Sequence, residues 1–135
     1  MRVDRDVRCE RAVKELVRLL NLNHIDPDQV RVVWSHSNSR AVARIWGVNS
    51  ILREGVGTNV RYVIELVKPL FTSLTCEEKV KTLTHELTHI PHTFSGYVRP
   101  HNKWFRRDLR LNMRRLRKVE RETLTAICES LSPPT

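Results

Sequence analysis

The first half of the chain changes from a helical to an alternating pattern of hydrophobic positions. Residues 6–22 place apolar side chains at helical spacing with charged residues between them, which predicts an amphipathic helix. The apolar positions on that face are Val13, Leu16, Val17 and Leu20. Residues 30–34, 41–46 and 62–66 are short runs rich in β-branched and aromatic residues, and we expect three strands there.

The second half begins with the strongest local signal. Thr75, with Glu78 three residues later, forms the pattern of a capping box, so a helix is predicted from about residue 76 to 90. Its core stripe is Val80, Leu83, Leu87 and Ile90. Pro91 cannot continue the helix comfortably, and a loop over residues 91–102 follows.

A long basic helix is predicted for about residues 103–130, with apolar anchors at helical spacing. Helices at both ends and a small sheet between them indicate an α+β fold. The length of 135 residues suits one core, so we expect residues 1–135 to form a single domain. Trp34 and Trp46 are expected in that core.

Composition limits the classes of protein that the chain can belong to. Hydrophobic residues make up 40% and charged residues 29%, as in a globular protein, and no apolar stretch is long enough to span a membrane. The mixed charges of residues 1–15 show no signal peptide, so we expect an intracellular, cytoplasmic protein. The three cysteines form no CxxC pair, and we expect reduced thiols without a disulfide.

The net charge of +9 is unevenly distributed. Residues 99–135 carry ten Lys/Arg against four Asp/Glu, in just over a quarter of the length. A basic C-terminal segment suggests an anionic partner, nucleic acid first, although such runs are often only a solvated helix face. The candidate contacts are Arg106, Arg107, Arg110, Arg114 and Arg117.

The segment His85-Glu86-Leu87-Thr88-His89 carries the candidate chemistry. Residues four apart on a helix lie on one face, so the two imidazoles can share one Zn²⁺. Glu86 lies one step round the helix, where its carboxylate can take a proton from a metal-activated water molecule. The pattern therefore predicts a zinc site with Glu86 as catalytic base.

A catalytic zinc ion needs a third protein ligand, and the sequence leaves several candidates. Ser95 stands where a metzincin would carry its third histidine, which excludes that subclass. We favour His101, because the loop of 12 residues after His89 can easily fold back on the metal. Glu120 or Glu122 on the next helix and His92 beyond Pro91 stay open as alternatives.

The segment HELTHIPHTFSGYVRPH, residues 85–101, resembles the signature of a small metallopeptidase family of archaea, archaeal viruses and phages. More distantly it is similar to SprT-like minimal zincins. The resemblance implies zinc ligands His85, His89 and His101, catalytic Glu86, and a zincin core in which a small sheet packs on the HExxH helix. His92 occupies a position that the family does not fix as histidine.

Two functions follow as hypotheses. The first is a zinc metallopeptidase that hydrolyses a protein or peptide substrate, in which an edge strand, expected at residues 62–66, binds the extended peptide. Tyr97 and Arg99 lie in the loop that could supply an oxyanion donor, or they pack and anchor that loop. The second is a zinc-stabilised nucleic-acid-binding module without hydrolytic activity, which would have no need of Glu86.

Overall fold

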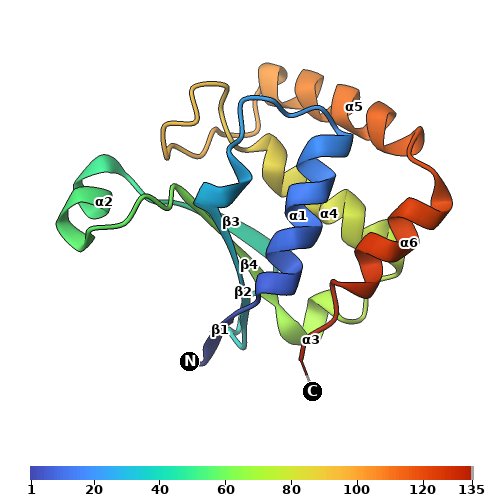
Figure 1. The fold of residues 1–135 in the computed structure, drawn as a ribbon, viewed down its shortest axis with the longest axis horizontal. Coiled ribbons are helices and arrows are strands. Elements are labelled where there is room, and N and C mark those ends of the chain that lie inside the picture. Colours follow the sequence, from blue (N-terminus) through green and yellow to red (C-terminus); the bar gives the residue numbers. More distant parts are fainter. Residues whose placement is uncertain (135) are drawn as a thin grey trace.

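The computed structural model describes residues 1–134 and has an α+β fold (Figure 1). The strands are β1 (Val3–Arg5), β2 (Val30–Ser35), β3 (Ala43–Gly47) and β4 (Tyr62–Val67). The helices are α1 (Val7–Leu19), α2 (Ser50–Val56), α3 (Lys68–Phe71), α4 (Cys76–Thr88), α5 (Lys103–Arg117) and α6 (Arg121–Glu129). A short 3-10 turn, Pro27–Gln29, precedes β2. The first helix and the three expected strands are thereby confirmed, whereas β1 was not predicted.

The four strands form one sheet in the order β1-β2-β4-β3. β2 and β4 run parallel, and the other two pairs are antiparallel. The prediction that residues 62–66 form an edge strand is wrong, because β4 has a strand on each side. β3 instead forms an edge, since its second side has no partner strand within residues 1–134, and β1 forms the opposite edge.

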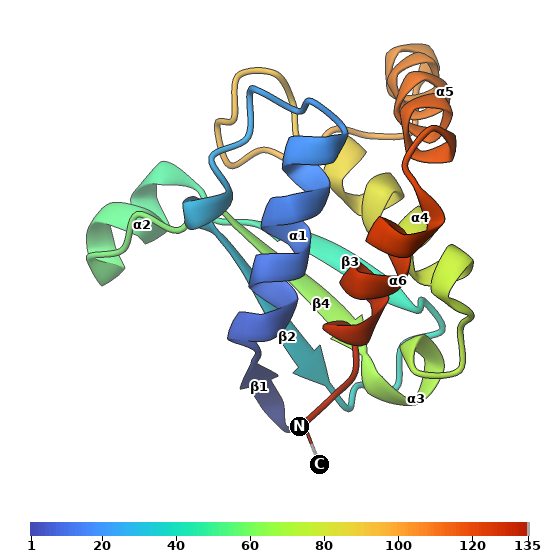
Figure 2. The ribbon, with the colours of Figure 1, turned by 45° about the vertical axis from the view of Figure 1, so that its right-hand side comes forward.

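The helices α1 and α4 pack on one face of this sheet, and α5 and α6 pack against α4 from the side away from it (Figure 2). The core extends from Cys9 to Leu131 and includes the fully buried Leu83, Leu87 and Ile90 of the predicted stripe. The short helix α2 projects from the body of the molecule in both views (Figures 1 and 2).

The start of α4 is fixed by the capping box that the sequence predicts. The Glu78 amide donates to the Thr75 hydroxyl at 3.2 Å, and the Thr75 amide donates to the Glu78 carboxylate at 2.9 Å. These two bonds satisfy donors that the first helical turn leaves free. The helix therefore begins at Cys76, and it ends at Thr88, just before Pro91.

The single basic helix predicted for residues 103–130 is wrong, because the chain leaves the helical conformation at Glu120. An unbroken helix of that length would extend about 42 Å in a straight line. The turn between α5 and α6 instead brings Ile127 and Leu131 back into the core. Burial of those side chains is a tertiary contact, and no proline or glycine marks the break.

The prediction of three reduced cysteines is wrong for two of them. Cys76 at the start of α4 forms a disulfide with Cys128 on α6, and their Cα atoms lie 5.6 Å apart. Their sequence separation of 52 residues gives no pairing pattern, so the bond depends on how the two helices pack. Cys9 is a free, buried thiol, as expected.

The face of the sheet opposite α1 and α4 carries a polar network around Glu65 of β4. Trp34 is buried as predicted, but Trp46 is 52% exposed, and its indole nitrogen donates to the Glu65 carboxylate at 2.9 Å. Its placement in the core was therefore wrong, because alternation along β3 turns it to this uncovered face.

Within residues 1–134, every helix is too short or too polar to cross a membrane.

Candidate metal centre

The last turns of α4 bring His85 and His89 to one side of the helix. Their ring centroids lie 5.1 Å apart, as the four-residue spacing predicts. Thr84 and Thr88 of the same helix are buried and donate to backbone carbonyls one turn earlier. His85 and His89 both line a cleft between α4 and β3.

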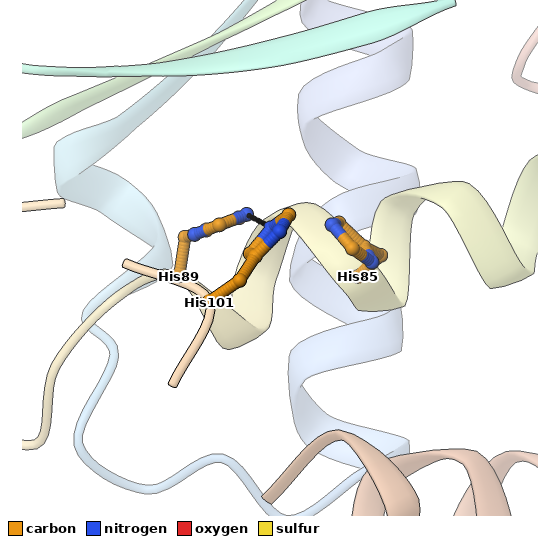
Figure 3. A group of neighbouring side chains, drawn as sticks. All are labelled: His85, His89 and His101. Carbon is orange, nitrogen blue, oxygen red and sulfur yellow. Dashed lines mark hydrogen bonds between the residues drawn. The ribbon is translucent and has the colours of Figure 1, made fainter. Parts of the chain in front are cut away.

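His101 reaches the same point from the loop that follows α4 (Figure 3). One ligand atom from each of His85, His89 and His101 can be chosen so that all lie within 4.8 Å of one another. The Nε2 atoms of His89 and His101 are 2.9 Å apart. This is the one group of three or more His, Cys, Asp or Glu residues within residues 1–134 whose atoms are close enough to hold a metal ion.

A hydrogen bond orients the His89 ring. Its Nδ1 lies 2.7 Å from the Arg99 carbonyl oxygen, which can only accept, so Nδ1 carries the hydrogen. The lone pair is then on Nε2, the atom that faces His101. Bonds of this kind fix the ring orientation of metal-ligating histidines.

Arg99 also ties the loop to both neighbouring helices. Its amide donates to the His89 carbonyl at 2.9 Å, and its guanidinium donates to the Thr88 carbonyl and to Asp108, each at 2.8 Å. Burial opposes the charge of Asp108, but hydrogen bonds from Arg99 and His92 lower the pKa of that carboxyl below its ordinary value. In this structure the Arg99 side chain is an anchor between α4 and α5.

The imidazoles are held in the form that binds metals. Burial, together with the neighbouring His89 and His101, lowers the pKa of His85 to about 4. Burial also lowers the pKa of His89. Both rings are therefore neutral near pH 7, with a lone pair available.

Glu86 lies beside this group in a different environment. Its side chain is buried, and burial raises the pKa of the carboxyl to about 7, although a hydrogen bond from the Ile45 backbone amide lowers it in part. A carboxyl group with a pKa near neutrality can both take up and release a proton at that pH. The contact with Ile45 also places Glu86 directly against the edge strand β3.

The histidines and Glu86 face a cleft of about 370 Å³ beside β3. Apart from them it is lined by Ala43, Arg44, Ile45, Trp46 and Val98. Phe105 of α5 closes the base of the group, because its ring lies 4.5–5.2 Å from each of the three imidazoles.

A family model described as "Putative phage metallopeptidase" matches residues 2–130. The chain belongs to this family. Membership implies a metal ion and supports a peptidase role, and the three histidines form the place where the ion can bind. No curated protein and no solved structure matches the chain.

The alternative third ligands lie elsewhere. His92 turns away from the group and approaches Asp108, with its Nε2 3.2 Å from the carboxylate. Glu120 and Glu122 are exposed at the start of α6 and do not belong to the group. Tyr97 is largely exposed in the loop, and its carbonyl accepts a hydrogen bond from the Tyr62 hydroxyl.

Tyr62 is a positioning residue that the sequence did not reveal. Its hydroxyl donates to the Tyr97 carbonyl at 2.9 Å and accepts from the Gly96 amide at 2.8 Å. Arg61 adds a bond of 2.7 Å to the Phe94 carbonyl. Together these bonds hold the loop that carries His101 against the end of β4, and no local sequence signal predicts them.

Proposed function

We propose that this chain is a zinc-dependent peptidase with a zincin-like site, in which His85, His89 and His101 hold the ion and Glu86 is the general base. The observation that carries the proposal is the combination of three converging imidazoles with one buried carboxylate that does not belong to the ligand group. A site that bound metal only for stability would gain nothing from a buried, non-ligating acid next to the ion.

The donor set fits zinc. Three neutral imidazoles are the ligands of several catalytic zinc sites, and such sites leave a coordination position open. Within residues 1–134 no fourth His, Cys, Asp or Glu joins the group. When bound, the ion supplies Lewis acidity, which polarises a peptide carbonyl and lowers the pKa of a water molecule toward about 7.

Glu86 moves the protons in this mechanism. Its carboxylate takes a proton from the attacking water molecule and delivers the proton to the departing amine. Ile45 holds the carboxylate toward the edge strand through its backbone amide. Because burial raises the pKa of Glu86, its carboxyl group can hold this proton near neutral pH between the two transfers.

β3 is suited to bind the substrate as an added strand. Val42 and Val48, which flank β3, bond toward β4: the Val42 carbonyl accepts from the Val67 amide, and the Val48 amide donates to the carbonyl of Arg61, just before β4. Alternate residues of a strand share a direction, so Ala43 and Ile45 turn their backbone groups to the open edge. An extended peptide paired there would pass over Glu86, with its side chains beside the apolar lining of the cleft.

The test compares metal content and hydrolysis of an unstructured protein by the wild type and by Glu86→Gln and His101→Ala. Glu86→Gln is expected to keep zinc and to lose about 10²–10⁴-fold in rate, the range for a general base. His101→Ala is expected to lose stoichiometric zinc, whereas His36→Ala, at an exposed position outside the group, keeps both zinc and activity.

Two results would contradict the proposal. Zinc binding by wild type and Glu86→Gln without hydrolysis by either would favour a zinc-stabilised binding module. Equal hydrolysis by wild type and Glu86→Gln would remove Glu86 from the reaction.

A further inference from the structure

The outward face of α5 carries a row of cations that the peptidase proposal does not use. Five exposed basic residues recur at steps of three or four along the helix, and a sixth directly follows the last of them. This spacing places all six on one side of the helix. They are Lys103, Arg107, Arg110, Arg114, Arg117 and Lys118. At about 1.5 Å per residue the row extends about 22 Å. Arg106 flanks it, near the His101 carbonyl.

Few carboxylates of the protein neutralise the positive charges of this cationic row. Asp108, the one acidic residue of α5, is largely buried and pairs with Arg99 and His92. The Arg107 Nε atom lies 3.4 Å from the same carboxylate. The structure records no ion pair within residues 1–134 for the other five members of the row. Like charges one helical turn apart repel each other, so a polyanion laid along α5 would relieve that repulsion.

The chemistry of this face favours nucleic acid over an acidic protein. The central parts of protein–protein interfaces are depleted in charged residues, whereas nucleic-acid interfaces are strongly positive. At the edge of the row, the exposed Trp104 ring has the cationic groups of Lys103 and Arg107 each 4.9 Å from its centroid. An aromatic ring among cations is typical of surfaces that bind nucleic-acid strands.

The position of α5 leaves this face accessible. α5 packs on α4, and Figure 2 shows it on the side of α4 away from the sheet. The row begins two residues after His101, at the first residue of α5. No residue of the row lines the cleft beside β3, so a strand bound along α5 would leave that cleft open.

We infer that the outward face of α5 binds the phosphate backbone of nucleic acid, independently of base sequence. Independence follows because contacts with phosphates carry no sequence information, and the row consists of cations alone. The inference does not depend on hydrolysis, so Glu86→Gln is expected to bind nucleic acid as tightly as the wild type.

The test measures the affinity of the zinc-loaded full chain for labelled duplex and single-stranded oligonucleotides by fluorescence anisotropy, between about 50 and 200 mM salt. The variant replaces Arg107, Arg110 and Arg114 by glutamine. Its matched control replaces the exposed Arg2, Arg11 and Arg40 by glutamine, which changes the net charge equally. Circular dichroism checks that both remain folded.

For a duplex, each phosphate contact contributes about 0.9 to the slope of log affinity against log salt, so losing three contacts should reduce the slope by about 2–3. The control should keep the wild-type slope, and replacement of the same three arginines by lysine should keep most of the affinity. Equal losses in the variant and the control would overturn the inference, since net charge alone would then explain binding. Absence of binding at low salt, or tighter binding of polyglutamate than of either oligonucleotide, would overturn it as well.

Discussion

Glu65 holds the edge strand β3 to the centre of the sheet, and replacing it by glutamine tests how much this contact stabilises the fold. Glu65 is only 5% exposed. It accepts hydrogen bonds from Arg44 and Trp46 of β3 and from the hydroxyls of Ser35 and Ser37. β3 also borders the cleft, so this network supports the strand against which Glu86 is placed.

The magnitude follows from the pKa of Glu65. Burial alone would raise this pKa, but the bonds from Arg44, the serines and Trp46 outweigh burial and lower it from 4.5 to about 2. Each pKa unit corresponds to about 1.4 kcal/mol, so the ionised form contributes about 3 kcal/mol to the free energy of unfolding. Because the folded pKa is the lower one, this contribution is complete above pH 4.5 and is lost as the pH falls toward 2.

The assay is urea denaturation of the wild type, Glu65→Gln and Glu54→Gln between about pH 7 and pH 3. Glu65→Gln is expected to be less stable than the wild type by about 2–3 kcal/mol near pH 7, with a smaller difference near pH 3. Glu54 is exposed on α2, so its replacement should change stability by less than about 0.5 kcal/mol. A difference that stays constant with pH, or that is below about 1 kcal/mol near pH 7, would refute this reasoning.

Two further predictions concern backbone contact and covalent linkage. A Cβ atom on Gly47 would lie 1.9 Å from the Gly96 carbonyl oxygen. Gly47→Ala should therefore lower the free energy of unfolding by about 3 kcal/mol or more, and it should weaken zinc binding because the loop has to move. Thermal melts and zinc titrations measure both effects, with Gly55→Ala, which has open space around it, as the control. The disulfide between Cys76 and Cys128 links residues 52 positions apart and so restricts the unfolded chain. Cys76→Ser should therefore destabilise the fold by about 4 kcal/mol. Equal melting temperatures of the wild type with and without reductant would contradict this prediction.

Parts of the candidate site could be predicted from local sequence. The capping box and the apolar stripe define α4, and the four-residue spacing then places His85 and His89 side by side. Their assignment as zinc ligands together with His101, and the extent of the domain, stay predictions. The sequence could not reveal Tyr62 as a support of the site, because its hydroxyl bonds to Gly96 and Tyr97, which lie 34 and 35 residues away along the chain.

The sequence by itself determined the elements whose stabilising contacts lie within a few residues. Helix α4 begins where Thr75 and Glu78 bond to each other's amides, and the strands follow runs of residues that favour a pleated surface. Only the tertiary structure decided that β3 forms the edge, that α5 ends before α6, and that Cys76 meets Cys128. Those outcomes depend on contacts between residues distant in sequence, whose free energy no local pattern records.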